Sequence, residues 1–253
     1  MTNIVIVTGA GSGIGRALAI NLSLKDIPVL AVGRRLNKLE ETAKLGHSKK
    51  ITPFSCDIAT IAGREKLIHH LADQSLSGLV HCAGTFPIQS LDDISLDSWR
   101  ETFATNLEAR LFLSRDLKSN LGKDGRILFI GSMSATTARK GAMAYCASKA
   151  ASFMLQECLK KEFNNQDPAV GIAIPGPVKT PILDQGMEAD LSIFPDGAGY
   201  ANSPQIDPER LGRFLSWLLI ETDRISYESK QWDIRHEDHH NQWLGEDELF
   251  ITV

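Results

Sequence analysis

A short apolar run near the amino terminus, Ile4-Val5-Ile6-Val7, leads directly into a glycine-rich stretch at residues 8–15, Thr-Gly-Ala-Gly-Ser-Gly-Ile-Gly. A continuous run of β-branched residues is typical of a strand buried on both faces of a parallel sheet. Residues from about 14 to 25 then have the apolar spacing of a helix. This order predicts a phosphate-binding turn, because glycine lets backbone N–H groups approach an anion at a helix N-terminus. A plain strand-to-helix turn is the alternative.

The spacing of the glycines narrows the kind of phosphate site. No Gly-Lys-Ser/Thr ends the stretch, which argues against a nucleoside-triphosphatase loop. The spacing Thr-Gly-x-x-x-Gly-x-Gly also differs from the Gly-x-Gly-x-x-Gly of the commonest dinucleotide fingerprint.

A second apolar run, at residues 27–32, ends in Gly33, Arg34 and Arg35. In a dinucleotide-binding fold this strand end meets the adenosine ribose, where an acid binds the 2′-hydroxyl of NAD and an Arg binds the 2′-phosphate of NADP. The guanidinium group pairs with phosphate oxygens bidentately. Arg34 and Arg35 therefore predict NADP(H) in preference to NAD(H). The alternative is two solvated arginines at the start of the next helix.

Tyr145 and Lys149 lie one helical turn apart on the same face of a predicted helix at residues 141–163. A nearby ammonium favours the phenolate, so Lys149 is expected to lower the pKa of Tyr145 from about 10. Tyr145 would then donate or accept a proton near neutral pH. Because a Tyr-x-x-x-Lys pair also occurs on solvated helices, its interpretation depends on the other motifs.

Strand and helix patterns alternate along the chain. Strands are also predicted at residues 51–55, 79–82, 126–130, 170–174 and 230–234, and helices at 64–73, 97–120 and 208–221. This alternation predicts an α/β fold, a single doubly wound parallel sheet of about seven strands with helices on both faces. Residues 1–253 are expected to form one domain. Residues 181–205 show no period and predict a substrate lid, and a polar tail begins at about residue 235.

Composition and charge exclude several classes of function. A net charge of -4 without a basic stripe argues against nucleic acid as a partner. No apolar run approaches the ~18 residues of a membrane span, and no signal peptide is expected. The four cysteines, Cys56, Cys82, Cys146 and Cys158, have no paired spacing, so we expect reduced thiols and a cytoplasmic protein.

Taken together, these motifs resemble those of the short-chain dehydrogenase/reductase family, closely over residues 4–180 and loosely over 208–234. The matching motifs are Thr8-Gly9-x-x-x-Gly13-x-Gly15, Asn106 in Thr-Asn-Leu, Ser132, Tyr145-x-x-x-Lys149, and Pro175-Gly176 with Thr180. Ser132 precedes Tyr145 by 13 residues, which is the family spacing. Two places depart from the family pattern: Cys82-Ala83-Gly84 stands where the family has Asn-Ala-Gly, and the segment after residue 230 lacks the usual ending.

The resemblance implies a Rossmann-like oxidoreductase that transfers a hydride between NADP(H) and a carbonyl or secondary alcohol substrate. Tyr145 would exchange the proton, Ser132 would hydrogen-bond the substrate oxygen, and Lys149 would hold the nicotinamide ribose. Asn106 would link Lys149 to solvent through water. The resemblance places the cofactor against Gly9, Ser12, Gly13, Ile14, Gly15, Arg34, Arg35, Asp57, Ile58, Ala83, Gly84, Tyr145, Lys149, Pro175, Gly176, Val178 and Thr180.

Two other functions remain open, an epimerase or dehydratase with permanently bound NAD(P) and a non-enzymatic NADP(H)-sensing regulator. The resemblance also implies a homodimer or homotetramer, for which Phe103, Leu111, Phe153 and Met154 supply surplus apolar surface. No metal is required by the chemistry, and the His-rich residues 236–240 are interpreted as solvated rather than metal-binding. The substrate is not specified by the sequence, although its pocket is expected to include Thr85, Phe86, Ser134, Met187 and Phe194.

Overall fold

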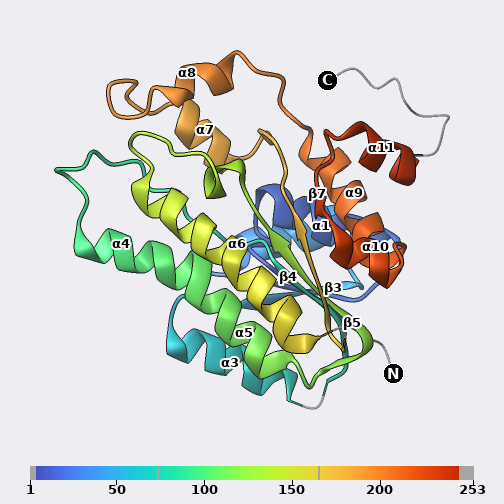
Figure 1. Ribbon diagram of the computed structural model, residues 1–253. Helices are drawn as coiled ribbons and strands as arrows, with labels where there is room; N and C mark the ends of the chain where they lie inside the picture. The colour runs from blue at the N-terminus through green and yellow to red at the C-terminus, as the bar shows by residue number, and fades with distance from the viewer. Residues whose placement is uncertain (1–3, 73, 165, 245–253) are drawn as a thin grey trace.

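The computed structural model describes residues 4–72, 74–164 and 166–244. In this part of the chain, seven strands form one sheet in the order β3-β2-β1-β4-β5-β6-β7, and every neighbouring pair is parallel (Figure 1). The strands are β1 Ile4–Thr8, β2 Val29–Gly33, β3 Ile51–Ser55, β4 Leu76–His81, β5 Leu121–Ile130, β6 Ala169–Ala173 and β7 Gln231–Trp232. The predicted doubly wound α/β fold is confirmed. The strand order reverses between β1 and β4, which is where such sheets bind ligands.

Helices cover both faces of the sheet. One face carries α1 Gly13–Leu24, α2 Leu36–Leu45, α9 Pro208–Ile220 and α10 Arg224–Ser229, and the other carries α3 Ile61–Leu71, α5 Ala109–Leu117 and α6 Met143–Phe163 (Figure 1). Alternate residues of β1 point to opposite cores, because side chains alternate along a strand. Val5 and Val7 pack beneath α1 and α9, whereas Ile6 packs beneath α3 and α5. Because both faces of β1 are buried, every residue from 4 to 7 is apolar.

The predicted long helix at residues 97–120 is interrupted. The chain forms α4 Leu96–Phe103, then a π-helical turn at Ala104–Glu108, then α5, which ends at Leu117. The apolar spacing does not reveal the interruption, because a π turn shifts the helical register by only one residue. Such turns are frequent at functional sites, and this one carries Asn106.

Residues 181–205 are more ordered than the predicted lid. They contain two short helices, α7 Pro181–Met187 and α8 Asp196–Ala201, which sequence periodicity does not indicate because each spans fewer than two full turns. Phe194 is fully buried between them, against Phe86 and Tyr200. The segment is also tied to the body of the protein by Lys140 Nζ, which donates to the carbonyl oxygen of Ser192 at 2.7 Å.

The carboxyl-terminal region differs most from the sequence interpretation. The strand predicted at residues 230–234 is only two residues long, and the polar tail contains a further helix, α11 Glu237–Leu244. Trp232 is fully buried, and its ring lies 5.0 Å from that of His239. The tail therefore packs on the sheet through this aromatic contact. The sequence did not indicate the helix, because the residues around the contact are mostly polar.

Candidate active site

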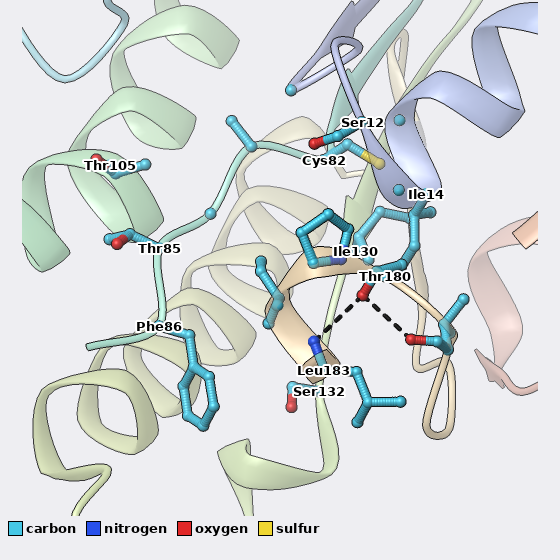
Figure 2. Close-up of a pocket in the computed structure, with 18 of the residues that line it drawn as sticks. Ser12, Ile14, Cys82, Thr85, Phe86, Thr105, Ile130, Ser132, Thr180 and Leu183 are labelled. Atoms are coloured by element: carbon cyan, nitrogen blue, oxygen red, sulfur yellow. Dashed lines mark hydrogen bonds between the residues drawn. The ribbon is translucent and has the colours of Figure 1, made fainter. Parts of the chain in front are cut away.

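A cleft of about 500 Å³ opens at the carboxyl ends of the strands (Figure 2). Of the predicted catalytic and cofactor-binding residues, all but Asn106 line this cleft. They comprise Gly9, Ser12, Gly13, Ile14, Gly15, Arg34, Arg35, Asp57, Ile58, Ala83, Gly84, Ser132, Tyr145, Lys149, Pro175, Gly176, Val178 and Thr180. Residues that are far apart in the sequence thus meet in one place, because parallel strands end at the same edge of the sheet.

Two glycines of the glycine-rich turn lie too close to neighbouring backbone to carry a side chain. Gly9 has a φ of +70°, and a Cβ there would lie 2.8 Å from the backbone nitrogen of Ala83. A Cβ on Gly15 would lie 2.5 Å from the carbonyl oxygen of Gly9. Only glycine satisfies both positions. The turn therefore delivers the N-terminus of α1, a helix of 12 residues, to the wall of the cleft, where its N–H groups favour an anion.

Thr8 and Thr180 each fix a part of the cleft wall through hydrogen bonds to the backbone. Thr8 Oγ1 accepts from the backbone nitrogens of Cys82 and Ala83, at 3.1 and 3.2 Å, which ties the end of β1 to the end of β4. Figure 2 shows Thr180 Oγ1, which donates to the carbonyl oxygen of Val178 at 3.1 Å and accepts from the backbone nitrogen of Leu183 at 3.4 Å. Thr180 thereby caps the start of α7 and fixes one wall of the cleft.

Arg34 and Arg35 lie where β2 ends, at one extremity of the cleft. The Arg34 side chain is 66% exposed and lies 3.6 Å from a carboxylate oxygen of Glu101 on α4. An exposed pair at this distance is worth little, so the guanidinium is available to another anion. Asp57, at the end of β3, accepts a hydrogen bond from the backbone nitrogen of Ala59 through Oδ1, at 3.1 Å.

Ser132, Tyr145 and Lys149 come together near the middle of the cleft. Ser132 follows β5 at the start of a short 3₁₀ turn, Met133–Ala135, while Tyr145 and Lys149 project from α6. Lys149 is buried, its Nζ donates to the carbonyl oxygen of Ile130 at 3.1 Å, and this nitrogen lies 5.5 Å from the centre of the Tyr145 ring. The predicted helical pair therefore faces the cleft rather than solvent.

The pKa of Tyr145 moves in the direction opposite to the one predicted from spacing. Burial raises the pKa of Tyr145, while hydrogen bonding with Ser132 and the positive charges of Arg110 and Arg139 oppose that rise. Burial, together with the charge of Arg110, lowers the pKa of Lys149 well below its ordinary value. The prediction of a lowered Tyr145 pKa was wrong for this structure, because helical spacing does not reveal burial, which outweighs the nearby positive charges.

Asn106 is buried behind the cleft, and its side-chain amide is fully engaged. Its Oδ1 accepts from the backbone nitrogen of Thr85 at 2.9 Å, and its Nδ2 donates to the Thr85 carbonyl and to Ser148 Oγ, both at 3.0 Å. These bonds join the π turn to the cleft wall and to α6. The side chain makes no described contact with Lys149, so the water link from Asn106 to Lys149 stays a prediction.

A buried arginine, Arg110, contacts α6 and was not singled out by the sequence. Arg110 is 2% exposed, and Nη1 donates to the Ile130 carbonyl at 3.1 Å and to Ser152 Oγ at 3.0 Å, while Nη2 donates to the Ala83 carbonyl at 3.3 Å. Burial lowers the pKa of Arg110 to about 10. Arg110 therefore holds the ends of β4 and β5 together and shares an acceptor with Lys149.

Three further cleft residues, Arg139, Tyr200 and Arg235, were also missed. Arg139 and Tyr200 come from loop and short-helix segments without periodicity, and Arg235 comes from the tail that was interpreted as merely polar. The Arg235 side chain packs on Gly176, where a Cβ would lie 2.6 Å from its Cδ. Of the predicted pocket residues, Thr85, Phe86 and Ser134 line the cleft, whereas Met187 and Phe194 are not among its lining residues.

Two further features of the described part of the chain bear on a metal site and on a membrane span. No group of three or more His, Cys, Asp or Glu side chains there is arranged to hold a metal ion. In the His-rich segment, His239 Nδ1 lies 3.0 Å from the backbone nitrogen of Asp233. None of the helices within residues 4–72, 74–164 and 166–244 is both long and apolar enough to cross a membrane.

The parallel sheet, the glycine turn at its switch point and the cleft above it define a Rossmann-like α/β protein of the dinucleotide-binding kind. The family model described as short chain dehydrogenase matches residues 3–190. The chain belongs to this family of oxidoreductases.

Similar proteins cover most of the chain. An uncharacterized oxidoreductase of Staphylococcus haemolyticus is 24% identical over 227 residues, which cover 88% of this chain and 93% of that protein. Sepiapterin reductase of Chlorobaculum tepidum is 28% identical over 227 residues, covering 83% of this chain and 93% of the reductase. A crystal structure with bound NADP, of a protein proposed to be an NAD(P)-dependent gluconate 5-dehydrogenase from Beutenbergia cavernae, has a TM-score of 0.80 and 28% identity, covering 92% of this chain and 94% of that one.

Proposed function

We propose that this protein transfers a hydride between NADP(H) and a carbonyl or secondary alcohol substrate, with Tyr145 as the proton donor or acceptor. The observation that carries the proposal is the convergence of Ser132, Tyr145 and Lys149 in the cleft that the glycine turn also lines. A carbonyl that receives a hydride must also gain a proton, and a phenol with a hydroxyl beside it provides that proton and a hydrogen bond.

The glycine turn and the end of β2 both have residues that suit a bound dinucleotide. Glycines 9, 13 and 15 and the start of α1 line the cleft, where the N-terminal amides of the helix would face a diphosphate. Arg34 and Arg35 supply positive charge at the far end for a 2′-phosphate. The NADP bound in the 28% identical crystal structure supports the same choice of cofactor. When bound, NADPH supplies the hydride.

Three residues of the protein are proposed to carry out the remaining steps, which are proton donation, hydrogen bonding to the substrate and cofactor binding. Tyr145, whose raised pKa keeps it protonated at neutral pH, donates the phenolic proton to the carbonyl oxygen during reduction. Ser132 donates a hydrogen bond to the same oxygen and stabilises the charge that develops on it. Lys149, which burial and the charge of Arg110 make harder to protonate, holds the nicotinamide ribose beside Tyr145. The carbonyl substrate gains one hydride and one proton to become the alcohol, and the proton on Tyr145 is restored from solvent.

The function is tested by incubating the purified protein with NADPH and a panel of ketones and aldehydes. Loss of nicotinamide absorbance that depends on the carbonyl compound, with the matching alcohol as product, is the expected result. A protein that binds NADPH but consumes none across the panel would instead be the sensing regulator, and one purified with tightly bound cofactor would favour the epimerase or dehydratase.

The cofactor preference makes a separate prediction. Arg34→Ala should weaken NADPH binding by about 1.5–3 kcal/mol, because it removes a charge-assisted contact to phosphate, and should leave NADH binding nearly unchanged. Glu101→Gln is the matched control, since it removes the carboxylate 3.6 Å from Arg34 but keeps the arginine; it should leave NADPH binding intact or strengthen it. Equal losses for NADPH and NADH in titrations of Arg34→Ala would contradict the assignment.

A further inference from the structure

More positive than negative side chains line the cleft. Its basic residues are Arg34, Arg35, Arg139, Lys149 and Arg235. Among the lining residues that the structure describes, the only carboxylate is that of Asp57, at the end of β3. The phosphates of the proposed cofactor account for positive charge along the glycine turn and at Arg34 and Arg35. They do not account for Arg139, which lies between Ser134 and Tyr200 beside the proposed substrate.

Arg139 is held rigidly from one side. Its Nε donates to Ser134 Oγ at 3.1 Å, and its Nη1 donates to Asp196 Oδ2 at 3.0 Å. The centre of its guanidinium lies 5.3 Å from the centre of the Tyr200 ring, and its side chain is only 17% exposed. Asp196 is not among the residues that line the cleft. Within the described structure Nη2 has no protein acceptor, so the guanidinium keeps donors for a ligand.

Arg139 lies close to Ser132 and Tyr145, the residues proposed to act on the substrate. Ser134, its hydrogen-bond partner, follows Ser132 by two residues on the same turn. The positive charge of Arg139 also acts on Tyr145, where it opposes the rise in pKa. The neighbouring walls are aromatic, since the Phe86 ring packs edge-on against that of Tyr145 with centres 4.6 Å apart. Aromatic side chains and one fixed cation therefore line the same cleft.

We propose that the substrate is a carbonyl compound that also carries a carboxylate, and that Arg139 binds this carboxylate. This inference rests on the proposed function for the identity of the reacting group. A guanidinium already fixed by Ser134 and Asp196 loses little further conformational freedom on binding, and its planar donors match a carboxylate. The competing explanation is that the Arg139–Asp196 pair merely anchors α8 to the body of the protein.

Two variants separate these explanations. Arg139→Met removes the charge and the anchor together, whereas Asp196→Asn weakens the anchor but keeps the cation. If Arg139 binds the substrate, Arg139→Met should lose selectivity for acids, and Asp196→Asn should keep or increase it because a competing carboxylate is gone. If the pair is only an anchor, the two variants should lose activity alike toward charged and neutral substrates.

The probes are three aryl keto acids, phenylglyoxylate, 3-benzoylpropionate and 4-acetylbenzoate, each compared with its uncharged methyl ester. With NADPH, the wild-type kcat/KM for at least one acid should exceed that for its ester by about tenfold or more. Arg139→Met should abolish that preference, because its kcat/KM should fall by about tenfold more on the acid than on the matching ester. An absence of acid preference with every pair, or equal losses on acid and ester in both variants, would overturn the proposal.

A binding readout distinguishes failure of this inference from failure of the proposed function. The melting temperature of the NADP⁺-saturated protein should rise with the acids more than with the esters, and Arg139→Met should abolish the difference. If the esters are reduced but the acids neither bind better nor react faster, the carboxylate site is refuted and the reductase function stands. If nothing is reduced but the acids bind through Arg139, the site stands and the reductase function is refuted.

Discussion

Tyr145 and Lys149 show how burial changes the chemistry of a familiar pair of residues. Their spacing predicts one face of a helix, and α6 places them there. The sequence interpretation assumed that the ammonium would act as in water, but Lys149 is buried, and burial with the charge of Arg110 lowers its pKa. Arg110, which is also buried, is the stronger fixed charge near both residues.

His81 gives a pH-dependent prediction at the same scale. It is 1% exposed, its Nε2 lies 2.9 Å from Ser114 Oγ, and burial with the charge of Arg110 lowers its pKa well below 6.5. The unfolded chain binds a proton here below about pH 6.5, whereas the folded protein does not. The stability that the neutral, buried His81 contributes should therefore be complete above about pH 6.5. Below it, the free energy of unfolding should fall by up to about 1.4 kcal/mol per pH unit.

The check is urea denaturation of wild type and His81→Gln across about pH 5 to 8. The variant should be less stable throughout but should lose stability more slowly on the acid side, because Gln does not titrate. His239, which also has a lowered pKa, contributes equally to both proteins and cancels in the comparison. Identical slopes for the two proteins would show that His81 protonates as easily when folded as when unfolded.

Residues within short motifs could be predicted, and residues from irregular segments could not. The glycine turn, Ser132, Tyr145 and Lys149 follow strands or lie on a helix, so strand order alone brings them to one edge. Arg139 and Arg235 reach the cleft from a loop and from the tail. Their positions depend on tertiary packing, such as that of Arg235 on Gly176, which no periodic pattern records.

Long regular elements could be predicted better than short or irregular ones. The strand at Ile51–Ser55 has the predicted bounds, and α6 ends at the predicted Phe163. The π turn after α4, and the helices α7 and α8, arise where local sequence gives no clear period and packing decides the conformation. Phe194 is an example, because it appears isolated in the sequence but is fully buried in the structure.

The segment at residues 181–205 remains a predicted lid whose opening can be measured. It should be the first site of limited proteolysis, and NADPH with substrate should slow the cutting. Phe194→Ala should accelerate cleavage within the segment, because losing a buried Phe costs about 3–5 kcal/mol. Leu191→Ala, at a side chain that is 52% exposed, is the control and should have little effect. First cleavage elsewhere, or unchanged cleavage in Phe194→Ala, would contradict this account.

At the scale of the whole molecule, the alternation of strands and helices was sufficient to predict the sheet. The oligomeric state could not be predicted in the same way, because it depends on contacts between chains. The outer side of α4, α5 and α6 leaves apolar groups exposed, including Leu111 at 37% and Met154 at 59% (Figure 1). Trp99 on α4 is 36% exposed and stacks on Phe103 with ring centres 4.7 Å apart. We expect a homodimer or homotetramer that covers this surface by two-fold pairing.

Analytical ultracentrifugation at micromolar concentration should show that oligomer. Met154→Glu should reduce the mass toward that of a monomer, because it places a charge in the proposed interface. Ile225→Glu is the matched control: this residue is 81% exposed on α10, on the other face of the sheet, and its substitution should leave the mass unchanged. A wild-type protein that sediments only as a monomer would refute the prediction.

Three variants test the division of catalytic work within one active site. Tyr145→Phe keeps the ring and removes the proton carrier, so NADPH should still bind. Ser132→Ala should slow turnover without weakening NADPH binding, because Ser132 is proposed to meet the substrate. Lys149→Ala should impair both the rate and the binding of NADPH.

The most direct measurement is the turnover rate of Tyr145→Phe beside its affinity for NADPH. We predict a rate reduced by about 10²–10⁴, the usual contribution of a positioned acid or base, with NADPH affinity close to that of wild type. Near-normal turnover in Tyr145→Phe would contradict the central claim, because the proton would then have to come from another group.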